Sequence, residues 1–258
     1  MKHIGLFEGI GGFSLAARWM NWETIAWCEW NEYCQKILKQ HFKEAQGYGD
    51  ITKTDFTIYR GQCDIVTGGF PCQPYSDAGL RKGKDDDRHL WPEMLRAIRE
   101  IQPKWVIGEN VPGIVSWSKG MVVKEIQTDL ENEGFTLLPP INIPACAVNA
   151  PHKRERIWFI AYSSNNGFKR RNKELQEKRQ YGHDEKDSAT KLWATLPFEP
   201  NDLPAPRITG KDDGLPGRMD RIKALGNAIV PQVAYELYRV IELMEVEMLK
   251  SQSDFLGE

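Results

Sequence analysis

Residues 64–76, which read Asp-Ile-Val-Thr-Gly-Gly-Phe-Pro-Cys-Gln-Pro-Tyr-Ser, constrain the fold of this chain more than any other stretch. A short apolar run ends there at two glycines, which allow a tight turn or the close approach of a ligand. Pro71 fixes its own φ and keeps Phe70 extended. Cys72 is therefore expected at the carboxyl end of a strand, where open α/β sheets bind their ligands. We interpret Cys72 as reactive. Most free cysteines are small core residues instead, but the polar loop around this one disfavours that alternative.

Short apolar runs alternate with helical patterns along most of the chain. Besides the run before Cys72, the pattern predicts strands at residues 4–7, 24–28, 105–108, 135–142 and 157–161, and a short strand that closes at residues 50–51. It predicts helices at residues 15–20, 31–41, 91–101, 122–133 and 233–249. Such an alternation indicates an α/β fold with a largely parallel sheet.

Composition narrows the class of protein without naming a function. The chain has 258 residues, enough for one large domain or a domain with a lobe. Its net charge of −2 excludes a generally basic nucleic-acid binder, so such binding must depend on local patches. Five cysteines without a Cys-x-x-Cys pattern indicate a reducing setting. We expect no signal peptide and no membrane span, and hence a cytoplasmic protein.

The glycine-rich stretch at residues 8–14 follows the first predicted strand and precedes a helix, as in nucleotide-binding folds. Its Gly-x-Gly-x-x-Gly fingerprint is incomplete because Ser14 takes the third position, which disfavours a nicotinamide dinucleotide but leaves an adenosine-type ligand open. Glu29 ends the second strand, where an acid can accept hydrogen bonds from a ribose diol or face a helix dipole. Asp50 can accept from an adenine amino group or cap a turn.

Further polar residues follow the later strands. Glu109 ends the strand at residues 105–108 as Cys72 ends the earlier one, so two ionisable residues are expected at one sheet edge. Arg154 and Arg156 are two positions apart and face the same way if the segment is extended. Paired guanidinium groups suit a phosphate or a base carbonyl, although a solvated basic edge is the alternative.

Seven stretches, in this order and at these spacings, resemble one family, the DNA cytosine-C5 methyltransferases. They are Phe-Glu-Gly-Ile-Gly-Gly from residue 7, Glu-Trp from 29, Asp-Ile from 50, Gly-Phe-Pro-Cys-Gln from 69, Glu-Asn-Val from 109, Arg-Glu-Arg from 154 and Gly-Asn-Ala-Ile-Val-Pro from 226. The resemblance implies a Rossmann-like S-adenosylmethionine-dependent methyltransferase fold. Residues 1–164 would be the catalytic and cofactor-binding domain, residues 165–217 a short target-recognition lobe, and residues 218–258 a segment that returns to the catalytic domain.

The resemblance also assigns roles to residues. S-adenosylmethionine would be the cofactor, with Glu29 on its ribose and Trp30 packed on its adenine, and no metal is expected. The residues around it would be Phe7, Gly9, Ile10, Gly11, Gly12, Glu29, Trp30, Asp50, Ile51, Leu90, Asn227 and Ala228.

The implied reaction is methylation of C5 of a cytosine flipped out of double-stranded DNA. A thiolate from Cys72 would add to C6 and make C5 nucleophilic, and Arg156 would favour that thiolate. Glu109 would hydrogen-bond N3 and the exocyclic amine. Arg154 would hold O2 of the base or a flanking phosphate. Residues 77–88 would close over the base.

Three departures from the family pattern bear on these expectations. His152 stands where a glutamine is usual, and Glu8 replaces a smaller residue and is expected to be solvated. The lobe at residues 165–217 is short, basic at Lys169, Arg170 and Arg171, and poor in apolar residues, so we expect a target of roughly two to four base pairs.

The expected setting is a monomer in a prokaryotic or phage-infected cell, with a companion restriction endonuclease or none. An RNA cytosine-C5 methyltransferase of the same family and a catalytically silent nucleic-acid-binding module remain alternatives. A nicotinamide oxidoreductase is the least favoured of the readings.

Overall fold

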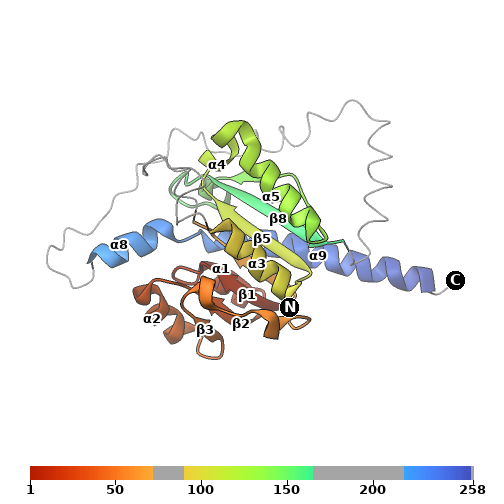
Figure 1. Ribbon diagram of the computed structural model, residues 1–258, viewed down its shortest axis with the longest axis horizontal. Coiled ribbons are helices and arrows are strands. Elements are labelled where there is room, and N and C mark those ends of the chain that lie inside the picture. The colour runs from red at the N-terminus through yellow and green to blue at the C-terminus, as the bar shows by residue number, and fades with distance from the viewer. Residues whose placement is uncertain (72–89, 165–217, 257–258) are drawn as a thin grey trace.

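The computed structural model describes residues 1–71, 90–164 and 218–256, which form a sheet with helices on both faces (Figure 1). The strands are β1 Lys2–Leu6, β2 Glu23–Cys28, β3 Gln46–Tyr48, β4 Ile65–Gly68, β5 Trp105–Asn110, β6 Phe135–Leu137, β7 Ile141–Ile143 and β8 Arg156–Ser163. The helices are α1 Gly12–Trp19, α2 Glu32–His41, α3 Trp91–Ile101, α4 Gly113–Ser116, α5 Met121–Asn132, α8 Arg218–Asn227 and α9 Pro231–Leu256, with short 3-10 turns η1 Ile51–Lys53, η2 Thr57–Tyr59, η5 Trp117–Gly120 and η6 Ala145–Val148.

The described residues form an eight-stranded sheet in the order β3-β2-β1-β4-β5-β8-β6, and β7 also pairs with β8. The pairs among β1 to β5 are parallel, whereas β8 runs antiparallel to β5 and to both β6 and β7. The predicted α/β fold with a largely parallel sheet is therefore confirmed. Since the carboxyl ends of β1, β2, β4 and β5 meet at one edge, the loops that follow them gather there.

Two strand predictions are wrong. The strand predicted to close at residues 50–51 is β3, which ends at Tyr48, and Ile51 begins the turn η1 instead. Residues 135–142 form not one strand but two, β6 and β7, which pair with different parts of β8. Pro139 and Pro140 separate them, because a proline has no backbone N–H to give to a sheet ladder.

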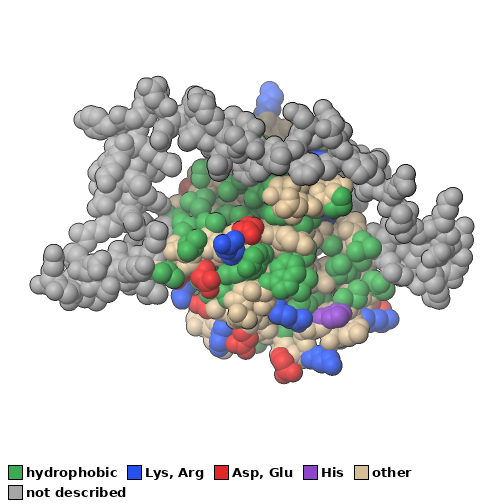
Figure 2. Space-filling model, turned by 180° about the vertical axis from the view of Figure 1, so that it is seen from behind, with side chains coloured by type: hydrophobic (Ala, Val, Ile, Leu, Met, Phe, Trp, Pro, Cys, Tyr) green, Lys and Arg blue, Asp and Glu red, His purple; other side chains and the backbone are tan. Residues whose placement is uncertain are grey.

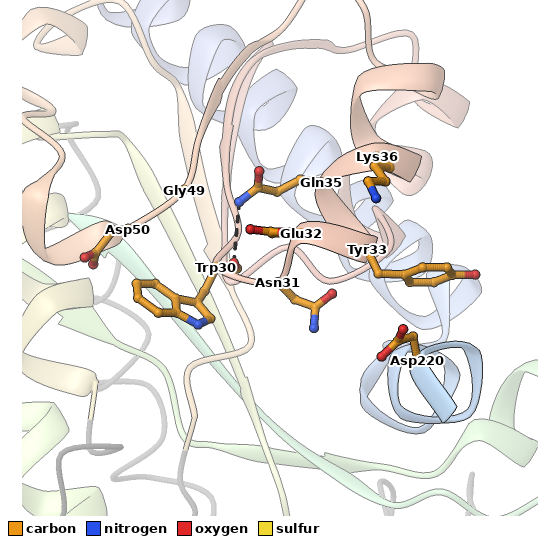
Figure 3. A pocket seen from close by; sticks show the side chains of 9 residues that line it. All are labelled: Trp30, Asn31, Glu32, Tyr33, Gln35, Lys36, Gly49, Asp50 and Asp220. Carbon is orange, nitrogen blue, oxygen red and sulfur yellow. Dashed lines mark hydrogen bonds between the residues drawn. The ribbon is translucent and has the colours of Figure 1, made fainter. Parts of the chain in front are cut away.

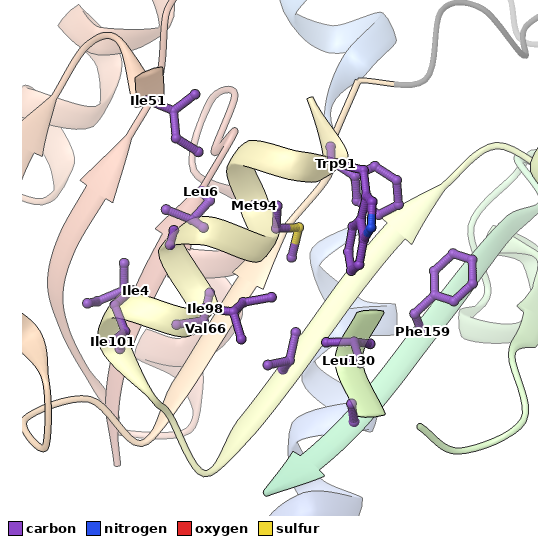
Figure 4. Close-up of a cluster of buried hydrophobic side chains, with 14 of the residues drawn as sticks. Ile4, Leu6, Ile51, Val66, Trp91, Met94, Ile98, Ile101, Leu130 and Phe159 are labelled. Atoms are coloured by element: carbon purple, nitrogen blue, oxygen red, sulfur yellow. The ribbon is translucent and has the colours of Figure 1, made fainter. Parts of the chain in front are cut away.

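Alternate residues of the central strands feed two apolar clusters, one on each face of the sheet. Val66 and Val106 belong to the first cluster, which α3 and α5 cover (Figure 4), and their neighbours Ile65 and Ile107 belong to the second. Successive side chains of a strand point to opposite faces, so a run that is apolar throughout requires helices on both sides. The sheet edge that carries the loops is thus held by packing from both directions.

Helix α9 covers the second cluster and is longer than the predicted helix at residues 233–249. Leu237, Tyr238 and Ile241 are buried against α1 and the sheet. Two buried indoles also hold the helix: the Nε1 of Trp22 donates to Glu242 at 3.3 Å, and that of Trp105 donates to Glu245 at 2.7 Å. The last part of the chain therefore returns to the sheet, and α9 lies behind β5 and β8 in Figure 1.

Seen from behind, the described surface shows hydrophobic side chains between scattered charged ones (Figure 2). None of the helices that the structure describes is long and apolar enough to cross a membrane. Several expectations lie outside the described residues, namely those for Cys72, for the loop at residues 77–88 and for the lobe at residues 165–217.

Candidate active site

The glycine-rich loop after β1 has an unusual backbone. Phe7, Gly9 and Gly11 all have positive φ, at 51°, 59° and 93°. Glycine adopts this region without a steric penalty, but Phe7 is strained there, and such strain persists only where surrounding contacts hold it. Ile10 is half-buried in the same loop, and the helix α1 begins at Gly12. The loop therefore keeps one defined shape at the sheet edge.

Glu29, at the end of β2, is one of the residues that hold this loop. Its Oε2 accepts from the Gly9 amide at 2.7 Å, and its Oε1 accepts from the Asn31 amide at 2.7 Å. Asn31 is itself the N-cap of α2, where its side chain accepts from the Cys34 amide. Glu29 thus joins the glycine loop to the start of α2, and its position fits the helix-start alternative as well as a ribose contact.

A pocket of about 670 Å³ opens beside the start of α2 (Figure 3). It is lined by Trp30, Asn31, Glu32, Tyr33, Gln35, Lys36, Gly49, Asp50 and Asp220. The Trp30 side chain is 73% exposed, so a flat indole face is free to stack on a planar group. The pocket therefore combines an aromatic platform with carboxylates and amides.

Asp50 lies at this pocket but already has partners. Its Oδ1 accepts from the Thr52 amide at 3.0 Å and so caps η1, and its Oδ2 lies 3.2 Å from the Nζ of Lys53. The turn-capping role is thus present whether or not a ligand binds. Ile51 is buried next to it. Leu90, predicted to touch the cofactor, is half-buried at the N-cap position of α3.

The segment after α8 packs on the glycine loop. A Cβ on Gly12 would lie 2.5 Å from Cγ1 of Ile229, so any side chain at position 12 would push this segment away. Asn227 ends α8 and is exposed, and Ala228 follows it half-buried. Residues far apart in sequence, at the two ends of the chain, therefore meet at one site.

The expectation that Arg154 and Arg156 lie in one extended segment is wrong. Arg154 has a φ of 33°, and β8 begins only at Arg156. The guanidinium of Arg154 donates to the carbonyl oxygens of Gly226, at 2.9 Å, and of Ala228. It therefore ties the segment before β8 to the end of α8 and to the residue that follows, while Arg156 has a different partner.

That partner is Glu109, at the carboxyl end of β5. Glu109 is 8% exposed, and its Oε1 lies 2.8 Å from the Nε of Arg156. Burial raises the pKa of Glu109, and the nearby guanidinium groups of Arg156 and Arg154 oppose that rise. A buried carboxyl group with a raised pKa and one cationic partner is typical of a catalytic acid or base.

The end of β4 lies against this carboxyl group. A Cβ on Gly69 would lie 3.3 Å from Oε2 of Glu109, and the Nδ2 of Asn110 donates to the carbonyl of Phe70 at 3.0 Å. Phe70 is two residues before Cys72 in the sequence. The chain that leads to Cys72 is therefore fixed directly beside Glu109.

The expectation that Glu8 is solvated is wrong. Only 4% of Glu8 is exposed, and its Oε1 accepts from the Ser14 amide at 2.8 Å. His152, the other departure in a motif, is half-buried, and its Nδ1 has no hydrogen-bond partner among the described residues.

Comparison with known proteins decides the family. The family model described as C-5 cytosine-specific DNA methylase matches residues 1–204. The chain belongs to this family. Type II methyltransferase M.Eco47II of Escherichia coli is 35% identical over 160 residues, which are 61% of this chain and 38% of that protein. Type II methyltransferase M.HpaII of Haemophilus parainfluenzae is 36% identical over 167 residues, or 64% and 46%. This chain thus spans less than half the length of either relative.

Solved structures of similar proteins agree with the C-5 cytosine methylase fold. The methyltransferase EhMeth of Entamoeba histolytica aligns with a TM-score of 0.51 and 26% identity, over 63% of this chain and 52% of that one. The Dnmt2 methyltransferase of S. pombe, at 22% identity and a TM-score of 0.51, supports the fold alone.

Seven of the nine residues that line the pocket, all except Trp30 and Asp50, were not predicted from the sequence. Tyr33 and Lys36 lie in the first turns of α2, directly after Glu29 and Trp30, so that proximity was an available signal. Asp220 offered no such signal, because it reaches the pocket from α8, a helix that was not predicted. Among the described residues no group of three or more His, Cys, Asp or Glu side chains is arranged to hold a metal.

Proposed function

We propose that this chain transfers a methyl group from S-adenosylmethionine to C5 of a cytosine in DNA, through a covalent bond between Cys72 and C6 of the base. One observation carries the proposal: the buried Glu109–Arg156 pair lies against the end of β4, which leads within two residues of Phe70 to Cys72. A nucleophile and an acid at one edge of the sheet are the two groups that this reaction needs.

The residues at the pocket fit S-adenosylmethionine. The exposed indole of Trp30 offers a stacking face to an adenine, and Asp50 offers carboxylate oxygens in the pocket. Glu29, which directly precedes Trp30 and holds the Gly9 amide, offers a further carboxylate next to the pocket. The glycine loop at residues 9–12 contacts Ile229, which directly follows Asn227 and Ala228, so these two residues lie within two positions of that contact. When bound, the cofactor supplies an activated methyl group.

Cys72 and Glu109 divide the chemistry on the base. The Cys72 thiolate forms a bond to C6, the electron pair of the C5–C6 double bond shifts to a C4–C5 double bond, and the pair of the C4–N3 double bond moves onto N3. Glu109, which burial disposes to keep a proton, hydrogen-bonds N3 and stabilises the charge that collects there. After C5 has taken the methyl group it loses its proton to a base, the bond from C6 to sulfur breaks, and Cys72 leaves as a thiolate.

The two arginines have separate roles in this proposal. Arg156 orients Glu109 and keeps its carboxyl group beside the base. Arg154 fixes Gly226 and Ala228, and so positions Asn227 at the cofactor, in place of the contact with the base expected from the sequence.

Substrate delivery follows from the same chemistry. Because C5 and C6 cannot be reached inside a duplex, the base is flipped out of double-stranded DNA. We assign residues 165–217 to target recognition and residues 218–258 to completion of the cofactor site.

The test is a methylation assay with S-adenosylmethionine that carries a deuterated methyl group. After incubation with unmethylated DNA, nucleosides are analysed by mass spectrometry, with Cys72→Ala as the matched control. We expect deuterated 5-methylcytosine with the natural chain and none with the variant. Labelling of tRNA but not DNA would favour the RNA alternative. Binding of DNA without any product would indicate a silent module, and a methyl group on an exocyclic nitrogen would contradict the mechanism.

A further inference from the structure

A second buried carboxyl group, that of Glu8, lies inside the glycine loop. It follows Phe7, whose φ is 51°, and precedes Gly9, whose φ is 59°. The backbone oxygen of Glu8 accepts from the Gly11 amide at 3.1 Å, and its side-chain Oε1 accepts from the Ser14 amide at 2.8 Å. One residue therefore holds both the middle of the loop and the first turn of α1.

Gly5 makes room for this arrangement. A Cβ built on Gly5 would lie 1.8 Å from Oε2 of Glu8, closer than any two such atoms can approach. The carboxyl group thus occupies the space that a side chain on β1 would fill. Gly5 and Glu8 form a matched pair, in which the strand gives up its side chain so that the loop can place one in the interior.

The carboxyl group also supplies what the start of α1 lacks. The N-cap residue Gly11 has no side chain to accept a hydrogen bond from the helix. Glu8 accepts from Ser14, the third residue of the helix, and a negative charge is favourable near a helix N-terminus. Its Oε2 is buried and has no hydrogen-bond partner among the described residues.

The charged and titratable groups that face Glu8 come from three elements. Glu29 follows β2 and repels a charge on Glu8, and Tyr238 of α9 is near enough to feel that charge. Burial raises the pKa of Tyr238 well above its usual value, so this phenol stays neutral. Behind it His3, on β1, hydrogen-bonds to Thr67, and burial lowers its pKa to about 3. Burial, opposed by the Ser14 amide, raises the pKa of Glu8 to about 7.

We propose that Glu8 is a positioning residue for the cofactor: its carboxyl group, seated in the space beside Gly5, fixes the loop at residues 9–12 and the start of α1 in the shape that S-adenosylmethionine requires. The inference rests on the proposed function only for the identity of the ligand. Because S-adenosylmethionine carries a sulfonium cation, its binding favours the ionised form of Glu8. Its affinity therefore rises as the pH increases through about 7.

The test compares Glu8→Ala, Glu8→Gln and the double variant Gly5→Asp/Glu8→Ala by calorimetric titration with S-adenosylmethionine between pH 6 and 8. We expect Glu8→Ala to weaken binding on the order of ten-fold or more, because a buried donor is left without its acceptor. Glu8→Gln should keep the acceptor but flatten the pH dependence. The double variant, which returns a carboxylate from the strand side, should recover most of the affinity. Equal affinity and an equal pH profile in all four proteins would overturn the proposal.

A second measurement needs no cofactor. Hydrogen exchange of the Ser14 amide in the free protein should be slow in the natural chain and in the double variant, and faster in Glu8→Ala. Circular dichroism checks that each variant is folded. If Glu8→Ala does not fold, Glu8→Gln replaces it in the comparison. If the natural chain binds no S-adenosylmethionine but Ser14 protection still depends on Glu8, the proposed function fails while the role of Glu8 in the loop stands. Protection that is the same with and without the carboxyl group would refute that role.

Discussion

Two buried glutamates, each at the carboxyl end of a parallel strand, have opposite surroundings in this molecule. Glu109 lies near the end of β5 and is 8% exposed, and Glu8 follows β1 and is 4% exposed. Burial raises the pKa of both. Glu109 has the guanidinium of Arg156 at 2.8 Å, whereas Glu8 has the Ser14 amide and the repelling charge of Glu29.

These different surroundings indicate different roles for the two glutamates. A cation beside Glu109 keeps its carboxyl group oriented and its proton available to a substrate, which suits an acid in a reaction. Glu8 faces inward to a backbone amide and a glycine, which suits a residue that holds the shape of a loop. The same substitution at the two positions should therefore have different consequences.

The largest expected effect is that of Glu109→Gln. An amide keeps the shape of the side chain but cannot release or take up a proton, so the methylation rate should fall on the order of 10²-fold or more. Binding of S-adenosylmethionine should be unchanged. Steady-state rates and calorimetry measure both quantities, with Glu8→Gln as the control that keeps the rate within a few-fold at saturating cofactor. An unchanged rate for Glu109→Gln would make Glu109 a structural residue.

Next in size is the effect of Glu8→Gln on the pH dependence of stability. The pKa of Glu8 is raised from 4.5 to about 7 in the folded protein, so the folded state holds an extra proton between these values. The contribution of Glu8 to the free energy of unfolding is fully present below pH 4.5 and is lost as the pH rises through about 7. The loss amounts to at most about 3 kcal/mol. Urea unfolding across this range should show the natural chain losing stability relative to the variant. Parallel curves would contradict burial of a titrating Glu8.

A smaller effect is expected for Arg156. Without this cation only the Arg154 guanidinium opposes the effect of burial, so the pKa of Glu109 rises further. In Arg156→Ala the rate should fall about ten-fold, as for one misplaced acid–base group, and the loss of rate at high pH should move to higher pH. Arg156→Lys keeps the charge and should leave that limb of the pH–rate profile in place. The same profile in all three proteins would show that Arg156 does not tune Glu109.

The smallest effect is expected for Trp30→Ala. This variant tests whether the pocket at Trp30 and the Glu109–Arg156 pair act independently. Loss of a stacking face, worth about 1 kcal/mol, should weaken cofactor binding about five-fold and leave the rate at saturating cofactor unchanged. Ile58→Ala, which removes another exposed apolar side chain outside the pocket, is the control. A fall in the rate at saturating cofactor would mean that the pocket and the Glu109–Arg156 pair are coupled.

The sequence predicted most of the sheet, because short apolar runs bounded by glycine, such as those of β4 and β5, are typical of central strands in a parallel sheet. It also predicted which strand ends carry polar residues, and Glu29 and Glu109 lie at those ends. The paired prolines at residues 139 and 140 were a readable signal for two strands, which the prediction of one strand at residues 135–142 ignored.

Side-chain partners were much less predictable. A glutamate in a glycine-rich loop reads as solvated, since its burial depends on the missing side chain of Gly5 on β1. Arg154 reads as half of an extended pair, but its partners are backbone carbonyls more than seventy residues away. Contacts of this kind arise from tertiary packing, which local pattern does not encode.

The central claim is the covalent bond between Cys72 and the base, and one trapping experiment tests it directly. DNA that carries 5-fluorocytosine is incubated with the chain and S-adenosylmethionine, and the product is digested and sequenced by mass spectrometry. Because fluorine cannot leave C5 as a proton does, the account predicts a stable adduct on the peptide that contains Cys72, and none with Cys72→Ser. Methylation of ordinary DNA without any trapped peptide, or an adduct on another cysteine, would contradict it.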